Sequence, residues 1–333
     1  IYLMYSNLID FTKKLYSNSE KIPLHEPFFD DQDKKALLDV IDSSFVSSIG
    51  EMTNNFEDEI KKFTKSKYAI ATVNGTSALH MSLMLSGVLS NDEVITQSLT
   101  FVATSNAITY CDAIPNYLDV DKDTLSLSPK SLENFLSNNC EIRNDGFCWN
   151  TVSNRRIKTC IIMHTFGLAG RSEKIKEICE RYNIFLIEDA AESLGTFSNN
   201  NHTGTIADIG ILSFNGNKII TTGGGGMILT QKKIIEEESR HLTTTAKIPH
   251  QWNFDHDAIG FNYRMPNLNA ALGMSQMKKL PRFLKVKRNI AECYQKWGEK
   301  NSMVFIREIK SSSSNYWLNA LLAENLEERN KIL

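Results

Sequence analysis

Short apolar runs alternate with amphipathic segments through most of the chain. Seven runs have the length and composition of β-strands and cover residues 68–73, 93–97, 114–120, 158–163, 184–188, 209–214 and 227–230. Between several of these runs, apolar positions follow helical spacing, starting near Thr76, over 102–110, from Pro129 and over 172–182. Strands interleaved with helices predict an α/β fold, in which a mostly parallel seven-stranded sheet is covered by helices on both faces.

Helices are also expected before the first strand. Residues 31–44 place apolar side chains at helical spacing with acidic residues near the start, and a second helix is expected over 55–64. The polar stretch 140–158 is interpreted as an insertion-like loop. After about Arg240 the pattern loosens into a connection rich in Thr and His.

The last part of the chain has the pattern of a smaller α+β domain. Helical spacing covers 268–277 and continues beyond Pro281 over 283–299, and 302–323 is expected to form a strand, a turn at SSSSN and a second strand. We therefore divide the chain into an N-terminal segment (1–30), a large α/β domain (31–265) and a smaller C-terminal domain (266–333). Because the chain stops inside a charged helical run, we expect the C-terminal domain to be incomplete.

Composition narrows the class of protein. A chain of 333 residues, 41% hydrophobic and 23% charged, has the balance of an ordinary globular protein with a substantial core. Its net charge is −2 and no basic tract suggests nucleic-acid binding. The N-terminal stretch has neither a signal-peptide core nor a membrane span. The six cysteines lack metal-ligand spacing and fit reduced thiols. We expect a cytoplasmic protein without a metal site.

One lysine, Lys218, lies in a short polar stretch between the sixth and seventh predicted strands, just before four glycines at 223–226. An amine beside small residues at a strand end suits a lysine that must reach a ligand held close to the backbone. Taken alone, the same stretch fits a surface hairpin with a solvated lysine and a glycine turn.

Two other strand ends carry residues suited to binding. At 74–80, Gly75 lets the chain turn, and Thr76 and Ser77 lie at a helix start, where hydroxyls and free N–H groups suit a phosphate. Ordinary helix capping explains the same hydroxyls. Phe101 follows the second strand, where its ring either lies against a planar cofactor or belongs to the core.

Acidic residues follow the fifth predicted strand. A carboxylate at the end of a buried strand is unfavourable unless a cation pairs with it, and a protonated heteroaromatic nitrogen would serve for Asp189. A helix N-cap is the alternative. With Ser213 at the end of the sixth strand, the chain offers a phosphate cup, a stacking ring, a carboxylate and an amine. These are the parts that hold pyridoxal 5′-phosphate (PLP) as a Schiff base. No Walker or GxGxxG motif is present.

Five motifs, in their order and spacing, resemble the DegT/DnrJ/EryC1/StrS family of PLP-dependent sugar aminotransferases of fold type I. They are NGTSALH, TFVATSNA, EDAAESLG, HTGTIADIGILSFNGNKIITTGGGGM and GFNYRMPNLNAALG, and the resemblance covers residues 22–282. Within the family the chain is most similar to the LegC-like branch, which aminates UDP-linked 4-keto-6-deoxy-N-acetylhexosamines. FNGNKIITTGGGGMILT and HLTTTAK suggest this branch.

The resemblance implies a role for each residue around the cofactor ring. Lys218 resembles the lysine that binds PLP covalently and serves as the catalytic base. Asp189 matches the partner of the pyridinium nitrogen, and Phe101 matches the stacking aromatic. Glu192 falls where relatives carry a side chain near the phenolic oxygen of the cofactor.

The phosphate ligands and the second subunit follow from the same motifs. The positions that match the family's phosphate site are Gly75, Thr76, Ser77 and Ser213. Asn262 and Arg264 match residues that reach into the active site of a neighbouring subunit, Asn262 toward the phosphate and Arg264 toward the substrate. The resemblance therefore implies a homodimer with shared active sites.

The implied reaction moves an amino group from glutamate to the 4-keto carbon of a nucleotide-linked 4-keto-6-deoxy sugar, of the UDP-N-acetylhexosamine type, for surface-glycan or nonulosonic-acid biosynthesis. A GDP- or dTDP-linked keto sugar is an alternative substrate. A PLP-dependent sugar dehydratase is another alternative, but such relatives replace the lysine with histidine, so Lys218 argues against it. A non-catalytic protein of this fold would be expected to lack Lys218 or Asp189.

Overall fold

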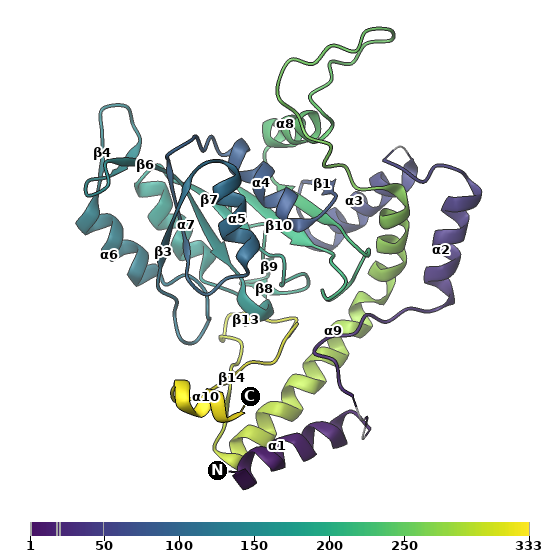
Figure 1. Cartoon of the computed structure of the whole chain (residues 1–333), viewed down its shortest axis with the longest axis vertical. Coiled ribbons are helices and arrows are strands. Elements are labelled where there is room, and N and C mark those ends of the chain that lie inside the picture. The colour runs from purple at the N-terminus through teal and green to yellow at the C-terminus, as the bar shows by residue number, and fades with distance from the viewer. Residues whose placement is uncertain (1, 18, 20, 49, 333) are drawn as a thin grey trace.

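A mixed sheet forms the centre of the molecule (Figure 1). The computed structural model describes residues 2–17, 19, 21–48 and 50–332, so Ile1 and Leu333, the ends of the predicted outer segments, lie outside the described residues. Seven strands follow the spatial order β1-β11-β10-β7-β6-β2-β3. They are β1 (Tyr68–Thr72), β2 (Glu93–Gln97), β3 (Ile114–Leu118), β6 (Arg155–Met163), β7 (Phe185–Asp189), β10 (Ile209–Ser213) and β11 (Gly226–Thr230). Each of the seven predicted strands is present.

All strands of this set except β11 point the same way. The neighbours β3, β2, β6, β7 and β10 pair in parallel, whereas β11 is antiparallel to both β10 and β1. The segment between β10 and β11 contains no helix. Because a parallel connection needs a longer crossover, usually a helix, the chain turns back beside β10 here. The predicted α/β fold with a mostly parallel sheet is confirmed.

Helices cover both faces of the sheet. The helices on one face are α4 (Gly75–Leu85), α5 (Val102–Tyr110) and α8 (Lys233–Thr243). The opposite face packs against α3 (Glu51–Thr64), α6 (Pro129–Asn139), α7 (Ser172–Arg181) and the first half of α9 (Asn267–Asn301). Side chains alternate between the faces along each strand, so Ile187 joins the first core and Leu186 the second.

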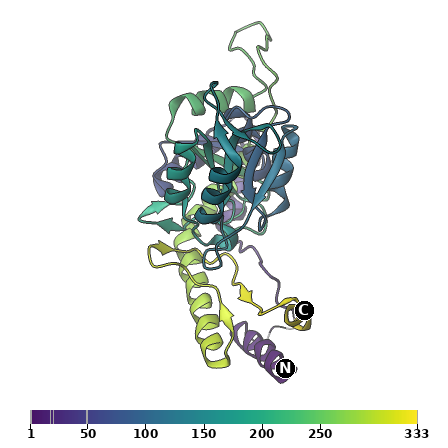
Figure 2. The same ribbon diagram turned by 90° about the vertical axis from the view of Figure 1, so that its left-hand side faces the viewer.

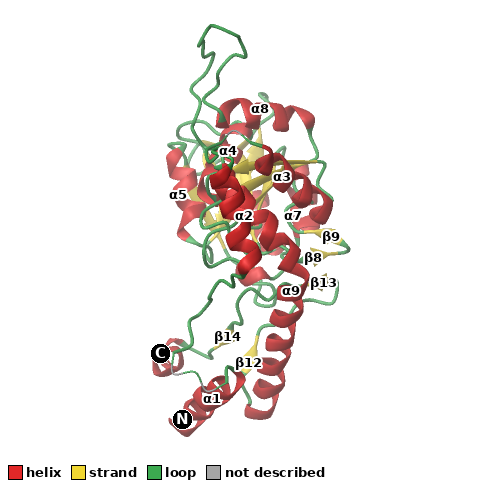
Figure 3. Ribbon diagram, turned by 90° about the vertical axis from the view of Figure 1, so that its right-hand side faces the viewer, coloured by secondary structure: helices red, strands yellow, loops and turns green. Residues whose placement is uncertain are grey.

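The long helix α9 carries the chain away from the sheet (Figures 1 and 3). Its first half packs against α2 (Asp31–Asp42) and α3, and its far end lies beside α1 (Tyr2–Leu15), where the rings of Phe11 and Trp297 stack 5.3 Å apart. The helical pattern expected over 268–277 and its continuation beyond Pro281 over 283–299 form one helix, with Leu280 and Ala291 both buried. No helix among the described residues is long and apolar enough to cross a membrane.

The chain returns toward the sheet after α9. The strands β12 (Val304–Phe305) and β14 (Leu321–Leu322) pair antiparallel and confirm the two strands predicted in 302–323, and α10 (Leu326–Ile332) follows. The SSSSN sequence is not a simple turn, because β13 (Ser312–Ser313) pairs with β8 (Phe197–Ser198), which also pairs with β9 (Asn201–His202). This pairing holds the C-terminal segment against the sheet domain (Figure 2). The domain boundary placed before α9 stays a prediction.

Other regions also differ from the prediction. Residues 140–158 are not a loop, because β4 (Cys140–Ile142) and β5 (Cys148–Asn150) form a hairpin that continues the sheet beyond β6. The helix α8 was not predicted. Its buried positions are Ile235, Ser239 and Thr243, so only one of the three is apolar and the helical pattern is weak.

A buried ion pair ties the N-terminal part of α2 to α9. Lys279 Nζ lies 2.8 Å from Asp33 Oδ1 and 3.0 Å from Asp30 Oδ1, and Gln276 Nε2 donates to Asp33 at 3.1 Å. The Asp33 residue is only 2% exposed. Since a buried carboxylate without its cation is strongly unfavourable, this contact fixes where α9 begins to leave the sheet.

Replacing the cation of this pair should destabilise the fold. We expect Lys279→Met to lower the free energy of unfolding by about 3 kcal/mol, because Asp33 stays buried without its charge partner. Lys34→Met provides the control, since Lys34 and Asp31 form an exposed pair whose loss should not be measurable. Denaturant unfolding of the three proteins tests this; equal midpoints for Lys279→Met and the parent would refute it.

Candidate active site

A cavity of about 270 Å³ lies at the carboxyl ends of the parallel strands. The loops that follow β1, β2, β7 and β10 meet there, because parallel strands end at the same edge of the sheet. Seven of the predicted site residues line it: Gly75, Thr76, Phe101, Asp189, Glu192, Ser213 and Lys218. The structure therefore brings together most of the residues that the sequence singled out.

The start of α4 forms one wall. Asn74 is the N-cap of this helix, and its Oδ1 accepts a hydrogen bond from the backbone N–H of Ser77 at 2.7 Å. A Cβ atom on Gly75 would lie 3.0 Å from Cβ of Ser213, so glycine allows the helix start to approach the end of β10. Thr76 lines the cavity, but Ser77 is buried outside the lining. The helix start still suits an anion.

Asp189 is buried at the end of β7. Its Oδ2 accepts a hydrogen bond from Thr104 Oγ1 at 2.8 Å, and its Oδ1 accepts one from the backbone N–H of Ala191 at 3.2 Å. Burial raises the pKa of Asp189, and these hydrogen bonds with the charge of Lys218 only partly oppose it. A cation placed in the cavity would stabilise the carboxylate, as the predicted role toward a ring nitrogen requires.

Lys218 reaches into the same cavity from the loop after β10. Its Nζ lies 3.5 Å from Glu192 Oε1 and 4.2 Å from the centre of the Trp317 ring. Burial lowers the pKa of Lys218, and the charges of Glu192 and Asp189 act in the opposite direction. The solvated hairpin is thus excluded, because the amine is enclosed between a carboxylate and an aromatic ring.

Glu192 is held as the partner of the lysine. The backbone N–H of Phe166 donates to its Oε2 at 2.8 Å, which leaves Oε1 facing Lys218. Burial raises the pKa of Glu192, and the nearby ammonium lowers it. The carboxylate of Glu192 therefore stabilises the ammonium of Lys218, and the ammonium stabilises the carboxylate, although burial disfavours both charges.

The neighbouring Glu188 has a structural role. It is fully buried on the opposite face of β7, 3.0 Å from His164 Nε2, and accepts hydrogen bonds from the backbone N–H groups of Ile206 and Ala207. Burial raises the pKa of Glu188, but the hydrogen bond and charge of His164 outweigh burial and lower it to about 2.

Trp317 is the functional candidate that the sequence did not reveal. It comes from the C-terminal segment, and its Nε1 donates to the carbonyl of Asn217 at 2.6 Å, which fixes the ring beside Lys218. No local pattern marks it, because it follows Lys218 by about a hundred residues and reaches the cavity through long-range contacts such as the β13–β8 pairing.

Asn262 and Arg264 lie apart from this cavity. Asn262 bridges to Thr244, and Arg264 bridges to Thr72 and lines a separate cavity of about 560 Å³. The Nε of Arg264 is buried without a hydrogen-bond partner among the described residues. Their predicted reach into a neighbouring subunit stays a prediction.

The donor set of the cavity fits PLP. An enclosed lysine amine, a buried carboxylate held by Thr104, a helix start and an exposed ring are the groups that this cofactor needs. Phe101 is 63% exposed, which excludes the core alternative and leaves its face available for stacking. Among the described residues, no group of three or more His, Cys, Asp and Glu side chains is arranged to hold a metal.

Fold and cavity define the class of PLP-dependent enzymes of fold type I. The chain belongs to the DegT/DnrJ/EryC1/StrS aminotransferase family, whose model matches residues 27–333. It is therefore a PLP-dependent sugar aminotransferase, which confirms the predicted family, cofactor and enzyme class.

Relatives and solved structures agree with this membership. The chain is 33% identical over 303 residues to GDP-perosamine synthase of Vibrio cholerae, covering 91% of this chain and 78% of that protein. It is 34% identical over 307 residues to the putative pyridoxal phosphate-dependent aminotransferase EpsN of Bacillus subtilis, covering 92% and 76%. A DegT DnrJ EryC1 StrS aminotransferase from Brucella abortus superposes with a TM-score of 0.81 at 26% identity, covering 89% and 76%.

The contact between Glu192 and Lys218 leads to a pH prediction for the apoprotein. In Glu192→Gln the carboxylate that stabilises the ammonium is lost, so the pKa of Lys218 should fall further. The pH at which Lys218 becomes reactive toward acetic anhydride, followed by peptide mass spectrometry, should move lower. Glu133→Gln, which removes a surface partner of Arg181, should not move it. A midpoint that stays in place or rises in Glu192→Gln would contradict the assigned contact.

Proposed function

We propose that the protein transfers the amino group of glutamate to the 4-keto carbon of a nucleotide-linked 4-keto-6-deoxy sugar. The observation that carries this proposal is the enclosed Lys218, paired with Glu192 in the cavity that also contains Asp189. Family membership supports the sugar substrate, and the reaction needs a lysine that both binds the cofactor and moves a proton.

Two observations bear on the nucleotide. The motifs around Lys218 and at 241–247 resemble the LegC-like branch and favour a UDP-linked N-acetylhexosamine, for surface-glycan or nonulosonic-acid biosynthesis. Relatives named GDP-perosamine synthase, at 33% and 34% identity, favour a GDP-linked sugar. Both are tested in the same assay below.

The positions of the side chains in the active-site cavity support a separate role for each of them. When bound, PLP supplies an electron-accepting ring. Asp189 would hold the ring nitrogen in its protonated form, and Phe101 would offer its ring for stacking. Lys218 would hold the cofactor covalently and, as a free amine, would carry a proton to and from the substrate carbon. Glu192 holds the ammonium form of Lys218 in place between these transfers.

We also propose a cytoplasmic homodimer with shared active sites. Asn262 and Arg264 do not line the active-site cavity of their own chain, which fits the implied role of these residues in the active site of a second copy. The arm at 245–260 presents Trp252, Phe254 and Ile259, each at least 75% exposed, and such an apolar surface is favourable only when covered.

A substrate panel with a lysine variant tests the reaction. The purified protein should aminate UDP- or GDP-linked 4-keto-6-deoxy sugars with glutamate, and borohydride should attach the cofactor irreversibly to Lys218. Lys218→Ala should reduce turnover by about 1,000-fold or more, because covalent and proton-transfer roles are lost together. Lys34→Ala is the exposed control. Undiminished turnover in Lys218→Ala would refute the mechanism.

Asp189→Asn should slow both half-reactions by about 100-fold, because a neutral amide no longer keeps the ring nitrogen protonated. Single-turnover measurements with glutamate and with the keto sugar separate the two halves. Asp123→Asn, which alters a surface pair with Arg171, should leave both rates unchanged. If Asp189→Asn were as fast as the parent, Asp189 would not have this role.

A further inference from the structure

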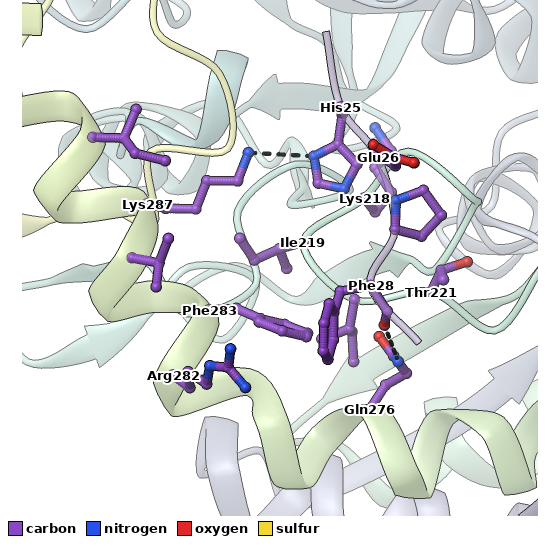
Figure 4. Close-up of a pocket in the computed structure, with 14 residues that line it drawn as sticks. His25, Glu26, Phe28, Lys218, Ile219, Thr221, Gln276, Arg282, Phe283 and Lys287 are labelled. Carbon is purple, nitrogen blue, oxygen red and sulfur yellow. Dashed lines mark hydrogen bonds between the residues drawn. The ribbon is translucent and has the colours of Figure 1, made fainter. Parts of the chain in front are cut away.

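A second cavity, of about 200 Å³, lies beside Lys218 (Figure 4). Three segments enclose it: the extended residues 25–28, the loop 218–221 and one side of α9 from Gln276 to Ile290. Lys218 lines both this cavity and the active-site cavity. The second cavity therefore lies next to the reactive lysine.

Lys287, on α9, points into the second cavity and has no acidic partner in the described part of the chain. Its Nζ donates to the carbonyl of Trp317 at 3.1 Å and lies 3.3 Å from Nδ1 of His25 (Figure 4). No carboxylate of the described residues lies within 4.0 Å of it. Burial lowers the pKa of Lys287. An ammonium in this setting is stabilised by an anion that enters the cavity.

The other polar groups of the cavity keep its potential positive. Burial, then the charge of Lys287, lowers the pKa of His25 to about 4, so this ring is neutral near pH 7 and can accept the proton of a hydrogen bond. Arg282 lies over the ring of Phe28 at 5.3 Å. The one carboxylate of the lining, Glu26, is exposed and forms no ion pair among the described residues.

The remaining walls are apolar. Phe28 and Phe283 meet edge to face with centres 6.1 Å apart, and Ile219 and Ile290 complete the lining. Such walls suit a short methylene chain that ends in a carboxylate.

We propose that the second cavity binds the side-chain carboxylate of a dicarboxylate amino donor, with Lys287 as its counter-ion. Trp317 lies between the two lysines, because its ring lies against Nζ of Lys218 and its carbonyl accepts a hydrogen bond from Lys287. A donor whose distal carboxylate is held by Lys287 would direct its amino group toward the cofactor at Lys218. The inference rests on the proposed aminotransfer. It adds that the protein selects its amino donor by the negative charge of the donor's side-chain carboxylate.

The experiment measures binding of glutarate, an unreactive dicarboxylate, to the holoprotein by calorimetry. Lys287→Met should weaken glutarate binding about 10- to 100-fold, the range for hydrogen bonds to charged groups. Lys287→Arg should restore most of the affinity. Lys285→Met, an exposed position on the same helix, should bind like the parent. The KM for glutamate should rise in Lys287→Met, and the half-reaction with the keto sugar should be unchanged.

Several outcomes overturn the proposal. Glutarate binding in Lys287→Met as tight as in the parent would overturn it. An equal loss of rate in both half-reactions would also overturn it, because such a loss indicates a structural role for Lys287. If Lys287→Met does not fold, the parent protein alone tests the proposal. Butyrate, which lacks the second carboxylate, should bind to it at least about 10-fold more weakly than glutarate. Equal affinities for the two compounds would refute the site. Lys287-dependent glutarate binding without any amination of the sugar panel would instead refute the proposed sugar substrate.

Discussion

The contact between Lys218 and Glu192 is the interaction on which the rest of the site depends. Burial disfavours the charged form of both groups, and each charge favours the other across 3.5 Å. The two pKa values are therefore drawn toward each other, which suits a lysine that must give up and take back a proton. This balance holds only while water stays out and both side chains keep their positions.

Those positions are fixed from several directions. The N–H of Phe166 holds Glu192, and Trp317 covers Lys218 with a ring anchored on Asn217. Asn315 donates to the carbonyls of Glu192 and Leu194 and so binds the C-terminal segment to the loop after β7. The ion pair and its aromatic cover are thus one connected unit, although its parts come from distant stretches of the chain.

The same unit borders two cavities. The active-site cavity opens at the strand ends, where a keto sugar can approach, and the second cavity lies between the N-terminal segment and α9. Lys218 borders both. In the proposed reaction a small donor would bind with its carboxylate in the second cavity and would pass its amino group to the cofactor held by Lys218, and the larger acceptor would then receive that group.

Much of this architecture is encoded locally. The seven strands follow from apolar runs, Gly75 from its place at a strand-to-helix turn, and Lys218 and Asp189 from their places at strand ends, because these signals lie within about ten residues of one another. The sequence missed α8, whose buried face is mainly Ser and Thr, and the short β4–β5 hairpin. Tertiary structure alone decided that Glu192 faces Lys218 while Glu188 faces His164, and that Trp317 and Lys287 join the lysine. Burial and contacts between distant parts of the chain determine these roles, and the spacing of neighbouring residues predicts neither of them.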